Sequence, residues 1–416
     1  MIRSTTRVTP AGTDTLGQLA AVAKRLTFGP APGRLDDWAD RGVDASTAID
    51  ELLAAEPRQP ELPELGSNDD YTRLRTWWVE QMLHPDAGVH ERMVWFWHTH
   101  LTSSLQKAEP GLMLRQHKLL RANALGNLRD LLHDITVDAA MLYWLDGASN
   151  TADAPNENYS RELMELFTLG HGADYTEQDV RNGARALAGW WVDDEHGSEV
   201  VFDESAKLAS ALDFLGTTVA SADDVADAVC DHPACAPFIA GRVHAQLAGF
   251  VPDDARRDEL SNVFRDADLE IAPLIEAIVR DPSFIDPGYR RPRSGLEWFL
   301  AVNHLYETDI DVYTLEGLGQ LPLEPPNVAG WPGDARWISA SALFQKAETA
   351  WDWAGDLPTL DRDDPVGHVL LRAALFEVSD ETRATLEAAA AAAEGRRETS
   401  SLLHALVACS PEFSMI

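Results

Sequence analysis

Two histidines stand two positions apart in one of the most apolar stretches of the chain, "WFWHTHL" at residues 95–101. A buried imidazole must hydrogen-bond through its ring nitrogens or lose their solvation, so His98 and His100 need partners if the segment is buried. The flanking sequence predicts a helix, in which the two side chains point about 200° apart and cannot share a metal ion from one face. A single histidine in an aromatic segment is more often a hydrogen-bonded core residue than a metal ligand, and this spacing matches neither HExxH nor a zinc finger.

Charged side chains form a second group in "PNENYSRELMEL", residues 155–166. Glu157, Arg161 and Glu165 are four apart and share one face of a predicted helix, while Glu162 and Glu165 are three apart and adjoin. The apolar residues around them leave only a narrow polar strip, which raises the pKa of a partly buried carboxylate unless Arg161 pairs with it. The strip is consistent with surface ion pairs, a buried charge clamp, an acid–base pair or a divalent metal site.

The overall charge disfavours some classes of partner. Asp and Glu outnumber Lys and Arg by 68 to 34, which gives a net charge of −34. Such a surface repels nucleic-acid phosphates and anionic lipid headgroups, so we expect neither nucleic acid nor a membrane as a partner. No run approaches the roughly 20 apolar residues of a membrane helix, and the first residues lack the apolar run of a signal peptide. We therefore expect a cytoplasmic protein.

Three cysteines, Cys230, Cys235 and Cys409, are too few for a disulfide framework in a chain of 416 residues. "CDHPAC" separates the first two by four residues without a second ligand pair, which is a weak metal signal. We expect both to be reduced and free of metal. The chain also lacks a GxSxG elbow, a Walker loop and a GxGxxG motif, so a serine hydrolase triad and a nucleotide-binding fold have no support.

Helical periodicity dominates the elements that must position these groups, and it predicts an all-α fold. Asn156 fits the N-cap of a helix that runs to about Leu169, and Thr176 with Asp179 forms an acidic variant of the capping box. Residues 192–220 lose the helical period and are expected to form a short hairpin or an irregular excursion. Residues 318–340 are dense in Pro, Gly and Trp and predict a loop. Helical patterns cover 15–29, 43–57, 70–105, 112–145, 222–230, 232–250, 253–266, 270–280, 290–306, 379–398 and 399–413.

Six long stretches carry motifs that keep one order along the chain: "ERMVWFWHTHLTSS", "ALGNLRDLLHDITVDAAMLYWLDG", "PNENYSRELMELFTLGHGADYTEQDVRNGARALAGWW", "HPACAPFIAGRV", "EPPNVAGWPGDARWIS" and "LLHALVACSPEF". Together they resemble DUF1800, a large family of uncharacterised bacterial proteins, over about residues 15–415. The resemblance implies one large helical domain, here 15–416 after a flexible segment at 1–14. It also implies that relatives are often secreted and are often encoded beside a sulfatase-like family, which is therefore a possible protein partner.

The resemblance also implies which polar residues belong to the family's pattern. The candidate catalytic residues are His98, His100, Glu157, Arg161, Glu162 and Glu165. The candidate binding residues are Asn156, Asn158, Arg185, Trp190, Asn327 and Trp331. One departure concerns "FDESAK", where relatives often carry a histidine before the aspartate. This chain has Phe202 there, and it keeps Asp203 and Lys207.

Three hypotheses about function follow from these residues. The first is a helical hydrolase or metal-assisted enzyme that uses the glutamates of the strip with His98 or His100. The second is a noncatalytic scaffold or protein-binding module in which a buried network of these histidines with Arg161 and Arg185 is structural. The third is a protein that binds a divalent metal through carboxylates without turnover, although the Glu-x-x-His motif of helical di-metal sites is absent. The loop "EPPNVAGWPGDARW" either braces the helices or forms an aromatic wall beside a pocket.

Overall fold

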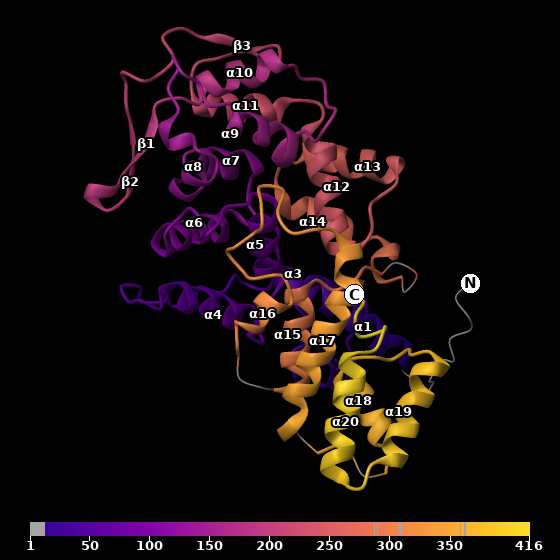
Figure 1. Ribbon diagram of the computed structural model, residues 1–416. Coiled ribbons are helices and arrows are strands. Elements are labelled where there is room, and N and C mark those ends of the chain that lie inside the picture. Colours follow the sequence, from indigo (N-terminus) through magenta and orange to yellow (C-terminus); the bar gives the residue numbers. More distant parts are fainter. Residues whose placement is uncertain (1–12, 287, 289, 308–309, 358, 362) are drawn as a thin grey trace.

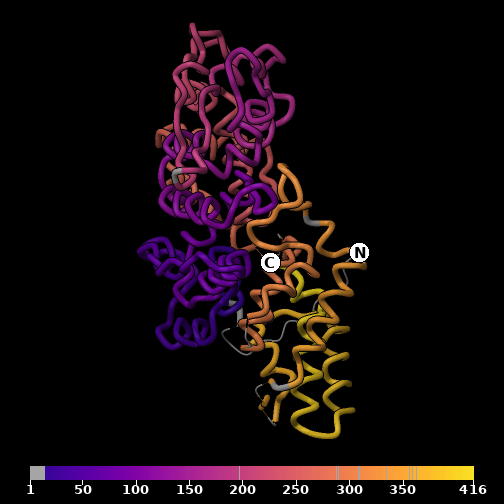
Figure 2. The backbone as a smooth tube through the Cα atoms, turned by 60° about the vertical axis from the view of Figure 1, so that its left-hand side comes forward, coloured from indigo at the N-terminus to yellow at the C-terminus, as the bar shows by residue number. Residues whose placement is uncertain are grey.

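A computed structural model of the chain describes residues 13–286, 288, 290–307, 310–357, 359–361 and 363–416. The α-helices are, in chain order, α1 (Thr13–Leu26), α2 (Arg34–Asp40), α3 (Ala45–Ala54), α4 (Asp70–Leu83), α5 (Val89–His100), α6 (Pro110–Asn123), α7 (Leu128–Thr136), α8 (Ala139–Trp144), α9 (Asn158–Glu162), α10 (Glu177–Ala186), α11 (Ala222–Asp231), α12 (Cys235–Ala248), α13 (Asp254–Asp266), α14 (Ile271–Val279), α15 (Gly295–Tyr306), α16 (Thr314–Gly317), α17 (Ala340–Trp353), α18 (Pro365–Arg372), α19 (Asp380–Ala392) and α20 (Arg396–Ala408). Within these described ranges strands are confined to two short hairpins, so the predicted all-α class is confirmed. The molecule is elongated, with α9–α11 at one end and α18–α20 at the other (Figures 1 and 2).

The excursion predicted at 192–220 consists of the two antiparallel hairpins. Strand β1 (Trp190–Asp193) pairs with β2 (Glu199–Phe202), and β3 (Leu212–Phe214) pairs with β4 (Thr217–Val219). Each sheet has only two strands, and the two hairpins lie beside the helices at one end of the molecule (Figure 1). They are too small to form a core of their own, so the helices stabilise them.

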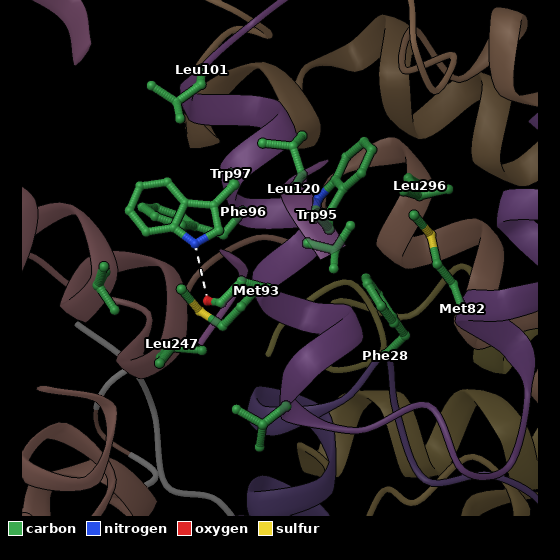
Figure 3. Close-up of a cluster of buried hydrophobic side chains, with 14 of the residues drawn as sticks. Phe28, Met82, Met93, Trp95, Phe96, Trp97, Leu101, Leu120, Leu247 and Leu296 are labelled. Carbon is green, nitrogen blue, oxygen red and sulfur yellow. Dashed lines mark hydrogen bonds between the residues drawn. The ribbon is translucent and has the colours of Figure 1, made fainter. Parts of the chain in front are cut away.

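Helix α5 runs through the interior of the molecule. Buried residues make up 10 of its 12 positions, so the helix has no solvent-facing side. Its aromatic side chains therefore point to several neighbours at once, as Figure 3 shows for Trp95, Phe96 and Trp97. The indole of Trp97 donates to the carbonyl of Ala124 at 3.1 Å, which satisfies its one polar atom. Because α5 is buried on all sides, its polar residues, among them Arg92, His98 and His100, must also find partners in the core.

The long helical patterns at 70–105 and 112–145 are wrong in one respect, because each is several helices. Pro85 follows the end of α4 and forces the preceding residue out of the helical region, so the chain turns before α5 begins. Asn127 and Asp138 then cap α7 and α8, accepting hydrogen bonds from the amides of Arg129 at 2.9 Å and Met141 at 3.0 Å. Periodicity alone does not distinguish one long helix from several helices with a common apolar period.

The ends of the chain were predicted less completely. Residues 1–12 of the expected flexible segment lie outside the described residues, and α1 begins at Thr13. The single domain from residue 15 stays a prediction, although buried apolar residues from Leu19 to Phe413 form one continuous cluster. Helices α2 and α16–α18 were not predicted. Helices α2, α16 and α18 are short. Helix α17 is longer, but it carries its apolar pattern on the outer face.

Candidate functional site

The two histidines of α5 point to opposite sides of the helix, as their spacing predicts. His98 is buried among three indoles, with ring centroids 5.0 Å from Trp78, 5.9 Å from Trp95 and 5.8 Å from Trp331. Among the described residues its Nε2 has no hydrogen-bond partner. Burial lowers the pKa of His98 to about 3, so the ring is neutral near pH 7.

A third imidazole belongs to the same cluster. His117 on α6 has both ring nitrogens without a hydrogen-bond partner in the described structure, and its ring meets Trp77 at 5.0 Å and Trp78 at 4.5 Å. These contacts are edge-on, with interplanar angles of 79° and 70°. An imidazole N–H that points at an indole face forms a weak hydrogen bond, which offsets part of the cost of burial. Burial, and then the charge of Arg121, lower the pKa of His117 well below its usual value.

His100 faces the helix that follows the Asn/Glu segment. Its Nε2 lies 2.8 Å from the carbonyl oxygen of Phe167, in the π-helical segment η2 (Leu163–Thr168) that continues α9. Its ring stacks on Phe96, with a centroid distance of 5.4 Å and an interplanar angle of 9°. Burial, and then Arg242, lower the pKa of His100 to about 3. The histidine segment and the Asn/Glu helix therefore pack together, as predicted, but through a backbone carbonyl.

The expected buried network of His98, His100, Arg161 and Arg185 does not form. Arg161 instead pairs with Glu177 at 2.9 Å, Glu157 at 3.2 Å and Glu165 at 3.6 Å. The side chains of Arg161 and Glu177 are 30% and 66% exposed, so this group, hereafter the Arg161 cluster, lies at the surface. The charges face outward because α9 buries Tyr159 and Ser160 on its other side.

Glu162 and Glu165 stay together at the edge of this cluster. Burial, and then the charge of Glu165, raise the pKa of Glu162. Glu165 also lies 3.3 Å from Nδ1 of His171, and burial, together with Glu165, raises the pKa of Tyr175 to about 12. Sequence reasoning missed His171, Tyr175 and Glu177, since they lie in the turn and the first residue of the next helix. The only signal was their nearness in "GHGADYTE".

The asparagines hold a loop and do not converge on the histidines. Asn156 is not the N-cap, which is Glu157. The Asn156 Oδ1 accepts from the amide of Asn158 at 3.0 Å, forming a turn before α9. The Asn158 side chain donates to the carbonyl of Leu145 at 3.3 Å. Asn150, which was not predicted, is buried, and its Oδ1 accepts a hydrogen bond from the amide of Asn156 at 2.9 Å.

Arg185 and Trp190 lie beside the segment that departs from the family pattern. The Arg185 Nε donates to the carbonyl of Ala152 at 3.3 Å, and the amide of that same residue donates to Ala206 at 3.0 Å. Trp190 packs on Phe202 with a centroid distance of 4.8 Å. The phenylalanine therefore makes an apolar contact across the hairpin. Asp203 accepts from Ser205 and Lys207 pairs with Glu204, all at the surface.

The Pro- and Gly-rich loop braces α5. Trp331 contacts Trp95 at 5.4 Å, and the Thr102 hydroxyl donates to the carbonyl of Val328 at 2.6 Å. Gly330 has a φ of 82°, and a Cβ there would lie 3.0 Å from the carbonyl oxygen of Thr99, so glycine allows this close approach. The loop also lines an open groove of about 690 Å³ with Asn327 and Trp331 in its wall. The loop therefore both braces α5 and forms part of the wall of the groove.

A buried ion network was missed by sequence reasoning. The carboxylate of Glu297 accepts from Arg92 at 2.5 Å and from Arg291 at 2.6 Å through each of its oxygens, and from the amide of Ser294 at 3.0 Å. Burial opposes ionisation, but Arg291 and Arg92 outweigh it and lower the pKa of Glu297. Arg291 is only 6 residues from Glu297, but Arg92 is 205 residues away, so no sequence spacing shows this triad.

No group of three or more His, Cys, Asp and Glu residues within the described ranges is arranged to hold a metal ion. Cys230 and Cys235 are buried free thiols, and a hydrogen bond from Cys230, then burial, raise the pKa of Cys235. In the part of the chain that the structure describes, no helix is both long and apolar enough to span a membrane.

Comparisons with known proteins agree with the motif pattern. Residues 21–415 match the family described as "Protein of unknown function (DUF1800)". Searches of curated proteins and of solved structures gave no significant match. Because the match spans nearly the whole chain, this protein belongs to the DUF1800 family.

Proposed function

We propose that this protein is a noncatalytic helical binding module that docks a basic protein partner on the outer face of α17. One observation carries the proposal. Phe344 and Trp351 are 65% and 63% exposed and lie seven residues apart on one face, with Leu343 beside them at 42%. Apolar residues exposed along a helix are typical of protein interaction sites.

The inner face of α17 makes the arrangement unusual. Lys346 is buried there and donates to the carbonyls of Trp337 at 3.1 Å and Arg293 at 3.4 Å. Burial, and then Arg293, lower its pKa to about 8. A surface helix normally buries its apolar stripe and exposes its lysines, and α17 does the opposite. An apolar outer face favours a second protein surface over water.

The charge around this face indicates the partner's chemistry. Glu348 and Asp352 are exposed on α17 one turn apart, next to Phe344 and Trp351, and the chain carries a net charge of −34. An amphipathic helix with apolar and basic residues complements both features. The sulfatase-like protein implied by the family resemblance is the first natural partner to test. Asn327 and Trp331 stay proposed binding residues because they line the groove.

A labelled Leu/Lys amphipathic helical peptide tests the proposal, with a Leu/Glu peptide as its charge-reversed control. We expect the double substitution Phe344→Ser and Trp351→Ser to weaken binding of the Leu/Lys peptide at least tenfold in fluorescence anisotropy. Val251→Ser, which changes an equally exposed apolar residue without altering charge, is the matched control. Equal binding of the Leu/Lys peptide by both variants would show that the affinity is only general electrostatic attraction. Equal binding of both peptides would show that the charge of the partner plays no part, and either result would overturn the proposal.

A second candidate is an acid–base enzyme at Glu162 and Glu165. What favours it is the raised pKa of Glu162 beside a carboxylate that pairs with Arg161, since carboxylates in unlike environments can divide the roles of acid and base. Crystals soaked in a mixture of small ester and glycoside substrates would test this reading. Intact substrate beside Glu162 in Glu162→Gln crystals, with product or no density in the unmodified protein, supports it, and absence of density in both crystals counts against it.

A further inference from the structure

A pocket of about 220 Å³ is lined by residues none of which belongs to α5 or α17. It forms where α1, from Gly17 to Arg25, meets the connection between α18 and α19, the segment after Ile285 and the C-terminal residues. Its walls are mixed. Ala20, Ala21, Ile285, Phe376 and Met415 contribute apolar surface, and Lys24 with several other charged side chains contributes polar surface. A cavity this small accepts only a compact molecule, since pockets for drug-sized ligands start at about 300 Å³.

Lys24 brings an amine into this pocket. Its Nζ donates to the carbonyl of Ala374 at 2.7 Å, at the end of α18. None of the ion pairs found between described residues involves Lys24, so the ammonium has no carboxylate partner there. Burial, then the charges of Arg293 and Arg290, lower the pKa of Lys24 well below its usual value.

The acidic side chains in the pocket walls keep their charge, but they contact groups other than Lys24. Glu377 pairs with Arg290 at 3.6 Å. Glu412 accepts from the amide of Ser379 at 2.8 Å and from a threonine hydroxyl. Asp286 accepts from the amide of Gly288 at 2.7 Å.

Two further basic groups add to the positive potential. Arg25 lies in the wall beside Lys24, and Arg293 is fully buried behind it. Arg293 donates to the carbonyl of Phe413, which does not neutralise its charge. The walls carry acidic as well as basic side chains, but the charges that act on Lys24 are those of Arg293 and Arg290, both positive. An anion placed beside the Lys24 amine would therefore interact favourably with these groups.

We propose that this pocket binds a small monocarboxylate with a compact apolar body, held by the Lys24 ammonium, with benzoate as a suitable probe. The carboxylate replaces water next to Nζ, and the apolar body contacts Ile285 and Phe376. An opposite charge beside an amine stabilises its protonated form, so binding raises the pKa of Lys24, and a proton is taken up to the extent that the amine is neutral before binding. The site is separate from the proposed docking face and does not depend on it.

Calorimetric titration of the full chain with benzoate at pH 8, in buffers of different ionisation enthalpy, tests both parts. We expect saturable binding whose apparent enthalpy changes with the buffer in proportion to the protons taken up. Lys24→Met keeps the apolar stem, and we expect it to weaken binding at least tenfold and abolish the proton uptake. Lys118→Met, at an exposed position of α6, is the control.

Lys24→Met could also loosen α18, because the ammonium bonds to that helix end. Ala21→Trp addresses this, since it fills the pocket and leaves the amine in place. We expect it to abolish benzoate binding while the fold is retained in circular dichroism. The proposal is overturned by absence of saturable binding, by unchanged binding in Ala21→Trp, or by inorganic phosphate binding as tightly as benzoate.

Discussion

Two ion clusters of this protein have opposite arrangements of charge, and one is exposed while the other is buried. In the Arg161 cluster one guanidinium meets three carboxylates at the surface, whereas in the interior one carboxylate, Glu297, meets Arg92 and Arg291. The i,i+4 spacing in the sequence predicts the surface cluster, but no such spacing predicts the buried one. The buried cluster nevertheless matters more for the free energy of unfolding, because exposed pairs contribute little and an unpaired buried charge costs several kcal/mol.

The largest expected effect is at Glu297. Glu297→Gln removes the charge that both arginines share and leaves two guanidinium groups buried without compensation. We expect a loss of about 3–5 kcal/mol of unfolding free energy in urea denaturation. A loss below about 1 kcal/mol would mean that water reaches the triad, and the contrast with the Arg161 cluster would disappear.

The imidazole cluster of α5 gives the next effect, as a dependence on pH. His98 has a pKa of about 3 when folded and near 6.5 in the unfolded chain, so between these values the unfolded state binds the extra proton. Stability therefore rises with pH through this window, by up to about 1.4 kcal/mol per pH unit for one histidine. His98→Leu should reduce the measured slope between pH 4.5 and 6.5 by the contribution of one proton, while His100 and His117 keep theirs.

A double variant sharpens the test. His98→Leu with His117→Leu should reduce the slope by two protons, because both pKa values are lowered. Burial raises the pKa of Asp138 to about 6, which acts with the opposite sign, but it is common to all variants and cancels in the comparison. An unchanged slope in urea titrations across this range would show that these rings are hydrated in the native state.

The N-terminal cap of α10, near the Arg161 cluster, is expected to contribute a smaller amount to the free energy of unfolding. Thr176 accepts from the amide of Asp179 at 3.2 Å, and the Asp179 carboxylate accepts from the amide of Thr176 at 2.8 Å, so the predicted capping box is confirmed. Thr176→Ala should cost about 1 kcal/mol in thermal or urea unfolding. Thr176→Ser, which keeps the hydroxyl, should recover most of it.

The sequence predicted what short-range rules determine. The opposite orientations of His98 and His100 follow from helical geometry, and the capping box follows from a spacing of three. The partners of those histidines could not be predicted, because Trp78, Trp331 and the Phe167 carbonyl come from elements distant in the chain. Exposure was equally out of reach, since the same charged strip is compatible with a buried clamp and with a surface cluster. The outer face of α17 was missed because an apolar pattern is normally taken to mark the buried side.

The smallest expected effect returns to Arg161 and completes the comparison. Arg161→Met removes a cation from among three carboxylates that water and salt already screen, so we expect a loss of at most about 1 kcal/mol. The three glutamates then repel one another, and this part of the loss should shrink at high salt. Glu162→Gln should raise the melting temperature slightly, because it removes a carboxylate whose charge is disfavoured by burial and by Glu165. If Arg161→Met instead destabilised the protein as strongly as Glu297→Gln and did so equally at low and high salt, the Arg161 cluster would be closed to solvent in solution, and the acid–base reading of Glu162 and Glu165 would gain over the binding module.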